Sequence, residues 1–541
     1  IFVNDAIAWS ADTTLTLDAV RNIEINADIV ASGTNAGLAL TYRGDYSFAN
    51  GGTVTLSGAS AGLSFGGNAY TLIHNVNDLQ AISGSGNYAL AEDIDASAAS
   101  SWNSGAGFAP INGFSGMLAG LNHAIDGLTI NRTSEGVVGM FASTSGGFSD
   151  FTLSNVSIVS GGNAGALAYR INGGSGVSNI HVTGSVTTVG SGGQVGGLIG
   201  WSDQTPISNS SSTATVTGFG EVGGLVGRLR AGSITNSYAT GAVTGTTDYV
   251  GGLVGGTYQG GTLTNVYASG NVTGTTNVGG LVGGAIFAGA VTANNAYWDV
   301  DSTGQSTSYA GTGINNADAF SEATYSGFDF ANTWVLIDGE TRPMLQSEYS
   351  TTIFTPHQLQ LMSLDLGANY QLGTNIDMTR AFTAGSGGFY GDVWGASGFD
   401  PVGDSIANPF TGGLDGQGHT ISGLTINRAG ERDVGLFGYT QYAFVSDLAF
   451  SGGSITGNQG VGALAGEFNG GTITSVSSNI PVEGSEFVGG LVGASQNLTA
   501  ISLSSASGDV SGSGYAAGGL IGALFEGTIS RSYATGNVSG D

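Results

Sequence analysis

The sequence contains no cysteine and no lysine, and it carries little charge of either sign. Without cysteine the chain has no disulfide, no thiolate ligand for a metal and no thiol nucleophile. All eleven basic residues are arginine, and the net charge is −28. Because nucleic acids and anionic lipids bind proteins through a basic footprint, this composition excludes both as partners.

Long apolar runs and a recognisable signal peptide are also absent, so we expect no insertion into a lipid bilayer. Only 9% of the residues are charged, against about 25% in ordinary soluble domains. Hydrophobic residues still make up 40%, which predicts a folded chain whose surface is Ser, Thr, Asn and Gly. The chain opens inside a strand pattern and stops inside a repeat, so we expect a fragment of a longer protein.

Glycine is abundant, with 98 residues, and much of it belongs to a repeated pentapeptide. The repeat is Gly-Gly-Leu-(Val/Ile)-Gly, and successive copies, looser ones included, lie 27 to 31 residues apart. Repetition at such a period is typical of a solenoid, in which each coil contacts only its neighbours. The full copies occupy residues 196–200, 223–227, 251–255, 279–283, 489–493 and 518–522.

Each repeat carries three short segments in which apolar and polar residues alternate, as in residues 222–250. Alternation of this length indicates strands, and glycine between the segments permits corners with positive φ. Strands that pair with their equivalents in the next repeat form a parallel β-helix, which the crossover rule makes right-handed. We therefore predict an all-β fold, a right-handed parallel β-helix (β-solenoid) with about three strands per coil.

The chain contains two copies of one module, since residues 88–95 match 370–377 and residues 120–132 match 416–428. Between the copies the repeat is broken, and before the first copy the strand pattern continues without a helix. The matches predict four regions: residues 1–71 as the end of a preceding β-helix, 72–297 as the first module, 298–353 as a closing segment and connector, and 354–541 as a second, truncated module.

Each module begins with a short helix signal. In the second module Thr355 is a candidate cap and Pro356 takes the first helical position. In the first module we expect Asn77 or Asp78 to cap the helix.

A polar position also recurs once per repeat. Stacked asparagines at a β-helix corner can bond to the coils above and below, so we predict a structural ladder. Its members are Asn179, Asn209, Asn236, Asn265 and Asn295, preceded by Asp150. Two residues after the last three come Tyr238, Tyr267 and Tyr297. We expect these tyrosines to stack near the same corner, and an exposed strip that binds sugars is the alternative.

Two further patterns are weak candidates for ligand binding. Asp299 and Asp301 are candidate ligands of a cation such as Ca²⁺, but they fit no known calcium loop, and a solvated turn is the simpler expectation. Arg43, Gly44 and Asp45 form the tripeptide that engages integrins in some proteins when it lies on a mobile loop. A chain of this length and glycine content also contains such a triplet by chance.

Catalysis on a β-helix needs clustered carboxylates and a base. The leading candidates are Asp415 and His419. His419 matches His123 in the first module, but Asp415 matches Ala119, so the two copies share no carboxylate at this place beside the histidine. We therefore predict no catalytic residues and no enzyme, with a polysaccharide lyase or hydrolase as the alternative.

Three parts of the sequence resemble known families. The unit GGLVG…NSYATG…VTG resembles the GLUG repeat of large bacterial surface proteins. Residues 297–313 and 334–345 resemble the segment that closes such arrays. Residues 1–42 resemble the end of the haemagglutination-activity domain of filamentous-haemagglutinin-type, two-partner-secretion exoproteins.

The resemblance implies a large adhesin at the surface of a Gram-negative bacterium or in a biofilm matrix. Such proteins are exported through an outer-membrane secretion pore and fold outside the cell, so we expect a secreted, extracellular protein. The implied partner is a polysaccharide or a cell-surface glycan, and no cofactor is implied. A passive stalk that displays a distal domain is the second alternative, since GLUG arrays also occur as non-catalytic parts of surface peptidases.

Overall fold

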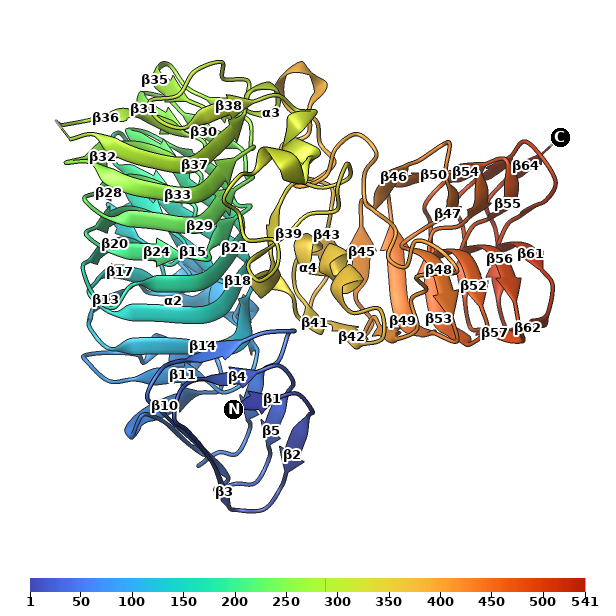
Figure 1. The fold of residues 1–541 in the computed structure, drawn as a ribbon, viewed down its shortest axis with the longest axis horizontal. Coiled ribbons are helices and arrows are strands. Elements are labelled where there is room, and N and C mark those ends of the chain that lie inside the picture. The colour runs from blue at the N-terminus through green and yellow to red at the C-terminus, as the bar shows by residue number, and fades with distance from the viewer. Residues whose placement is uncertain (288, 541) are drawn as a thin grey trace. The chain divides into compact units, whose positions relative to one another are not determined.

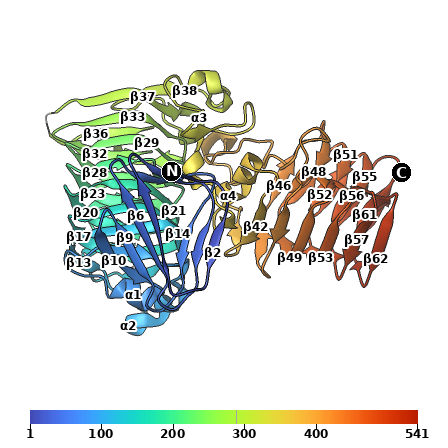
Figure 2. The ribbon, with the colours of Figure 1, turned by 60° about the horizontal axis from the view of Figure 1, so that its bottom comes forward.

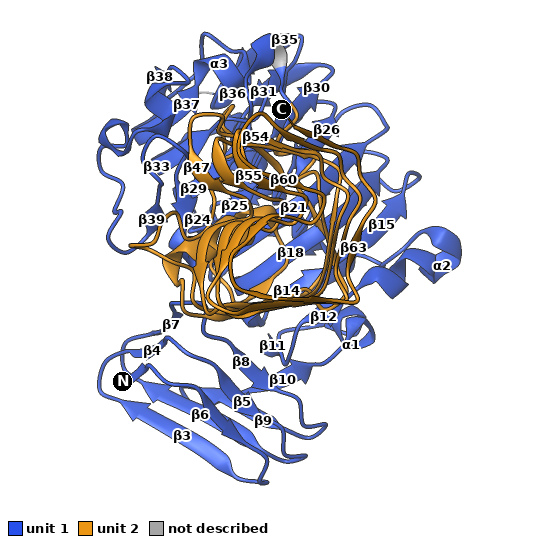
Figure 3. Ribbon diagram, turned by 90° about the vertical axis from the view of Figure 1, so that its right-hand side faces the viewer, with its two compact units in different colours: residues 1–348, 384–392 blue, residues 349–383, 393–541 orange. Residues whose placement is uncertain are grey.

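The computed structural model describes residues 1–287 and 289–540. It contains two compact units, coloured separately in Figure 3. Unit 1 is residues 1–348 with 384–392, and unit 2 is residues 349–383 with 393–541. In each unit the strands of one coil pair in parallel with the equivalent strands of the next. The predicted all-β parallel solenoid is therefore confirmed.

Residues 1–65 form coils of three strands, with alternate apolar side chains buried inside. β10 (Asn68–Ile73) then pairs antiparallel with the last of these strands. The three sheets are β1 (Phe2–Val3), β4 (Ile23–Ile25) and β7 (Tyr46–Phe48); β2 (Ile7–Trp9), β5 (Ile29–Ala31) and β8 (Val54–Leu56); and β3 (Thr14–Ala19), β6 (Gly37–Tyr42) and β9 (Gly62–Phe65).

Three further stacks of strands in unit 1 build the first module (Figures 1 and 2). The ladder sheet contains β14 (Met117–Asp126), β18 (Gly147–Ser160), β21 (Val177–Thr188), β29 (Ser233–Ala239), β33 (Gly261–Ala268) and β37 (Val291–Asp299). The arginine sheet contains β13 (Ile111–Phe114), β17 (Phe141–Thr144), β20 (Ala168–Asn172), β23 (Ile199–Asp203), β28 (Val226–Arg230), β32 (Val254–Tyr258) and β36 (Val282–Ala285). A sheet of short strands contains β16 (Val137–Val138), β19 (Asn163–Gly165), β22 (Gln194–Gly196), β27 (Glu221–Gly223), β31 (Asp248–Gly251) and β35 (Thr276–Gly279).

Coils of three strands, as predicted, occur in residues 1–65 and in the coil of β18, β19 and β20, whereas the later repeat coils have four short strands. One coil runs through β26 (Thr215–Gly218), β27, β28 and β29, and the next begins with β30 (Val243–Gly245). The pentapeptide does not lie within one strand, because the chain turns a corner at its Gly-Leu step, as at Gly224-Leu225 between β27 and β28. There the amides of Leu225 and Val226 both donate to the carbonyl of Leu253 in the next coil, at 3.0 Å.

The glycines of this corner are required by close backbone contact rather than by positive φ. A Cβ on Gly224 would lie 2.1 Å from the carbonyl oxygen of Gly252, and one on Gly252 would lie 2.2 Å from that of Gly280. Neither glycine has positive φ. The leucine that follows turns inward, and Leu198, Leu225 and their successors are fully buried in one elongated core. Removing this apolar surface from water is the main stabilising contribution to each coil.

The short helices at the start of the modules are confirmed. α4 (Pro356–Leu361) has Thr355 as its cap in a capping box with Gln358. α1 (Val76–Gln80) is capped by Asn75, so the prediction of Asn77 or Asp78 was wrong. Asn75 has the extended backbone of a cap, and its side chain accepts from the amides of Asn77 and Asp78. No helix of the described residues has the length and apolar character needed to cross a bilayer.

Unit 2 repeats the four-strand coil. Its arginine-sheet equivalent contains β48 (Phe437–Gln441), β52 (Ala465–Asn469), β56 (Val492–Gln496) and β61 (Ile521–Leu524). Its ladder-sheet equivalent contains β44 (Gly413–Asp415), β49 (Phe444–Ser451), β53 (Thr472–Ser478), β57 (Thr499–Ser502) and β62 (Gly527–Ser530). The other two sheets contain β46 (Thr425–Asn427), β50 (Ser454–Thr456), β54 (Val482–Gly484), β59 (Val510–Gly512) and β64 (Val538–Gly540), and β47 (Arg432–Val434), β51 (Gln459–Val461), β55 (Glu486–Gly489) and β60 (Ala517–Gly518).

Candidate functional site

The tyrosine column of the ladder sheet is covered by the closing segment. Tyr238 and Tyr267 stack with ring centroids 5.0 Å apart and planes 3° apart, and they are 0% and 2% exposed. Trp334 of the closing segment packs on both rings, and the Tyr238 hydroxyl donates to Glu348. Tyr297 is only half-buried. The alternative of an exposed sugar-binding strip is thus wrong for the first two tyrosines, because aromatic residues of the segment bury them.

The asparagine column lies at a corner where every member has a left-handed backbone, with φ between 45° and 62°. Asparagine tolerates this conformation better than other non-glycine residues. Asn295 donates from Nδ2 to Asn265 Oδ1 at 2.9 Å, and Asn265 donates to Asn236 at 3.1 Å. Asn179 donates to Asp150 at 3.1 Å. At Asn209 the Oδ1 atom has no hydrogen-bond partner among the described residues, so the bonded column is interrupted there.

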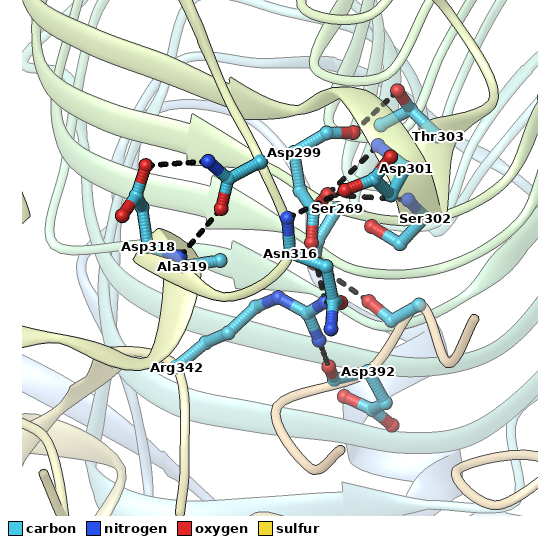
Figure 4. A network of polar contacts seen from close by, with 12 residues as sticks. Ser269, Asp299, Asp301, Ser302, Thr303, Asn316, Asp318, Ala319, Arg342 and Asp392 are labelled. Atoms are coloured by element: carbon cyan, nitrogen blue, oxygen red, sulfur yellow. Dashed lines mark hydrogen bonds and ion pairs between the residues drawn. The ribbon is translucent and has the colours of Figure 1, made fainter. Parts of the chain in front are cut away.

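Asp299 and Asp301 hold the closing segment instead of facing solvent (Figure 4). Asp299 is buried, caps α3 (Val300–Thr303) and accepts from Arg342 Nη2 at 2.6 Å. Asp301 accepts from the amide of Asn316 at 2.7 Å. Arg342, itself 0% exposed, also donates to Asn316 and to the carbonyl of Asp392. A guanidinium therefore supplies the positive charge next to Asp299, where the sequence had suggested a cation or a solvated turn.

The Arg43-Gly44-Asp45 tripeptide is an exposed turn between β6 and β7. The turn stacks on the preceding coil: Gly44 donates from its amide to Arg21 O at 3.0 Å, and Asp45 donates from its amide to Asn22 Oδ1 at 3.3 Å. A Cβ on Gly44 would lie 2.1 Å from Asn22 Oδ1. The triplet is therefore part of the coil stacking, although its side chains reach solvent.

Asp415 of unit 2 and His123 of unit 1 each have local hydrogen-bond partners. Asp415 accepts from the Gln417 amide and side chain, at 3.0 and 2.7 Å. His123 is buried, with Nδ1 3.2 Å from Asp93 Oδ1 and Nε2 2.9 Å from the carbonyl of Val54. Burial opposes the imidazolium, but Asp93 and Val54 together outweigh it and raise the pKa of His123. Among the described residues no group of three or more His, Asp or Glu could hold a metal ion.

The outer surface of the arginine sheet carries the most concentrated set of binding groups. Arg170, Trp201 and Arg228 are register partners on three consecutive coils. The Cζ atoms of Arg170 and Arg228 lie 3.9 and 5.0 Å from the centre of the Trp201 ring. Such cation–π stacking fixes the orientation of both guanidinium groups.

Two carboxylates tie this stack to a neighbouring column. Asp203 accepts from Arg170 and from Arg230, each at 2.7 Å, and Glu221 accepts from Arg228 at 2.6 Å. Glu221 also accepts from the side chain of Gln194, and Arg230 lies by the ring of Tyr258. We call the whole set the Arg–Trp face: Tyr169, Arg170, Gln194, Trp201, Asp203, Glu221, Arg228, Arg230 and Tyr258.

The repeat period of the sequence predicts the alignment of the Arg–Trp stack. Arg170, Trp201 and Arg228 each stand three residues after a central leucine of the repeat. The same positions in unit 2 hold Glu467, Ala494 and Ala523, which pair in register on β52, β56 and β61. Repeat periodicity therefore could have placed these residues in one outward column, whereas the ion pairs with Asp203 and Glu221 needed the structure.

Comparison with known proteins finds one family motif and two sequence relatives. The GLUG motif matches residues 191–217, 220–244, 247–273 and 513–539. The chain carries the GLUG motif. It is 31% identical over 580 aligned positions to halomucin of Haloquadratum walsbyi, which covers 80% of this chain and 6% of halomucin. It is 34% identical over 118 positions to a protein of Evansella cellulosilytica named "Putative Gly-rich membrane protein", covering 22% of this chain and 12% of that protein. The chain thus spans a small fraction of either relative.

A solved structure named as a "putative immunoglobulin A1 protease" from Bacteroides ovatus superposes with a TM-score of 0.40 at 21% identity. The superposition covers 52% of this chain and 93% of that structure.

Proposed function

We propose that this chain is a section of a large extracellular surface protein whose GLUG solenoid acts as a stiff adhesive stalk. The observation that carries the proposal is the parallel pairing from coil to coil within each module, for example Arg228 with Gly256 and Gly256 with Gly284. The hydrogen bonds of these pairs run along the axis of the coils, so a pulling force is shared by many bonds at once. The similarity to halomucin and to a Gly-rich membrane protein supports a place at the cell surface.

The proposed partner is a polysaccharide or a cell-surface glycan, bound without a cofactor and without turnover. The polar coils, rich in Ser, Thr and Asn, offer hydrogen bonds to sugar hydroxyls, and the half-buried side chains of the Arg–Trp face add aromatic and charged groups. Export through an outer-membrane pore of a Gram-negative bacterium remains a prediction from the resemblance of residues 1–42. The similarity to an archaeal protein shows that related sequences are not confined to bacteria.

Binding of the purified 541-residue chain to immobilised polysaccharides tests the proposal. The set of probes should include neutral and acidic polymers, each with and without Ca²⁺. We expect saturable binding to at least one polymer and no release of reducing ends or unsaturated sugars. Absence of binding to every probe would favour a passive stalk, and release of products that Asp415→Ala abolishes would favour the lyase or hydrolase.

A further inference from the structure

We propose that the Arg–Trp face binds an acidic polysaccharide, with its guanidinium groups receiving the carboxylates of the sugar units. This inference rests on the proposed adhesive function and adds to it the face used and the class of ligand.

The local charge of the face is opposite to that of the chain. Arg170, Arg228 and Arg230 face the two carboxylates of Asp203 and Glu221, so three positive charges minus two negative charges leave one positive charge. These three arginines come from only eleven in a chain of net charge −28. At physiological salt, exposed charges more than about 8 Å apart are largely screened. A carboxylate at the face therefore interacts with these arginines more than with distant acidic residues.

The Arg–Trp face has hydrogen-bond donors that its own carboxylates do not use. Arg170 and Arg228 each give one Nη2 bond to a carboxylate, which leaves the rest of each five-donor fork. The Nε atoms of both arginines and Nε1 of Trp201 have no hydrogen-bond partner among the described residues, but these atoms are buried. The donors that the half-buried side chains of Arg170 and Arg228 offer to a ligand are therefore their remaining Nη groups, which cannot accept. A carboxylate accepts without donating, so it complements this surface better than a hydroxyl, which brings a donor of its own.

The coil geometry suits a linear polymer laid along the solenoid axis. Adjacent parallel strands lie about 4.8 Å apart, so two guanidinium groups on either side of the Trp201 coil repeat at roughly twice that spacing. Asp203 and Glu221 hold the guanidinium forks in place through their ion pairs, which lowers the conformational entropy lost on binding. Tyr169 and Tyr258 are half-buried at the margins and offer ring faces to the apolar side of a sugar.

Unit 2 provides a matched internal control. At the three positions of the Arg–Trp stack it has Glu467, Ala494 and Ala523, so it lacks both the guanidinium groups and the indole. Glu467 accepts from Gln496 in the next coil. The shared fold therefore does not require the Arg–Trp stack, which is what a function specific to unit 1 predicts.

Binding of the full chain to polygalacturonate tests the inference, with fully methyl-esterified polygalacturonate and a DNA duplex as comparison probes. We expect binding to polygalacturonate that weakens with added salt, and at least about tenfold weaker binding to the ester and to DNA. Arg170→Gln with Arg228→Gln should weaken polygalacturonate binding about tenfold or more, and Trp201→Ala should weaken it as well. Arg170→Lys with Arg228→Lys should restore only part, because lysine lacks the planar fork.

Glu467→Gln in unit 2 is the control that should leave the affinity unchanged. Equal thermal midpoints of the variants and the parent chain show that the fold is intact. Unchanged binding in the Arg and Trp variants, or equal binding of the ester, would overturn the inference and leave adhesion standing. Failure of the parent chain to bind any polysaccharide would overturn the proposed function together with the inference.

Discussion

Replacing Asp150 by asparagine should stabilise unit 1, and the gain should depend on pH. Asp150 is the first member of a column whose later members are asparagines, and it accepts from Asn179. Burial is the largest influence on its carboxyl, and together with the nearby Asp45 charge it raises the pKa of Asp150 from 3.8 to about 6. Hydrogen bonds from Asn179, Ser149 and Tyr46 act in the opposite direction but do not offset it.

The direction of the pH dependence of stability follows from the proton bound to Asp150. Between pH 3.8 and about 6 the folded protein keeps a proton that the unfolded chain has lost, so stability falls as pH rises through this interval. Above about pH 6 the whole deficit is present, which is about 3 kcal/mol for a fully buried group. Asp150 is partly exposed, and solvent screening lowers the expected gain of Asp150→Asn to about 1–2 kcal/mol at neutral pH, with almost none below pH 3.8.

Urea denaturation followed by tryptophan fluorescence at a series of pH values measures this gain, because five of the six tryptophans lie in unit 1. The matched control is Asn179→Asp, which places a second carboxylate in the same column and should lower stability at neutral pH. An Asp150→Asn protein that gains nothing at neutral pH, or gains equally at acid and neutral pH, would refute the reasoning.

Three further changes test the packing of unit 1. Gly224→Ala should cost about 1–3 kcal/mol in denaturation, since its Cβ meets the next coil, whereas Gly62→Ala, with nothing within 4 Å, should be nearly neutral. Arg342→Leu should cost about 3–5 kcal/mol by leaving Asp299 buried and unpaired, and adding Asp299→Asn should recover much of the thermal midpoint. The pKa of His123 is raised, so its contribution to the free energy of unfolding is complete below about pH 6.5 and is lost as the pH rises through the pKa of the folded state. His123→Gln should remove this pH dependence from the thermal midpoint of unfolding, measured at a series of pH values.

The solenoid was predictable because one signal, the period of the repeat, fixes both the strands and their partners. The corner inside the pentapeptide was not predicted from the sequence. Its glycines, Gly224 and Gly252, do not have the positive φ of the usual glycine turn. What requires them is the distance to the next coil, which the sequence does not encode locally.

The site was less predictable because two segments distant in sequence decide it. Tyr238 and Tyr267 stack as predicted, but the sequence did not show that Trp334 of the closing segment packs on them. Asp299, expected in a solvated turn, is buried beside Arg342. The repeat thus predicted the positions of these residues on the coil, but not their partners from the closing segment.

The low content of charged residues, 9% of the chain, follows from the stacking of the coils. A parallel solenoid places equivalent residues about 4.8 Å apart, where two like charges repel by ~1 kcal/mol in water and ~3 kcal/mol at an effective dielectric constant of 20. Where a coil does carry a carboxylate, a side-chain amide of the adjacent coil repeatedly donates a hydrogen bond to it. The pairs are Asp12 with Asn35, Asp126 with Asn155, Asp150 with Asn179, Glu221 with Gln194, Glu486 with Gln459, Glu467 with Gln496 and Asp509 with Asn537.

The Arg–Trp face obeys the same rule in a different way. Trp201 separates Arg170 from Arg228 in one column, and the neighbouring column runs Asn172, Asp203, Arg230, so no two cations occupy adjacent coils of one column. Arg170 and Arg228 each spend only one Nη2 bond on a carboxylate, so other Nη donors remain. An anion bound across this face, as proposed above, would neutralise charges that the solenoid can hold only at a distance from one another.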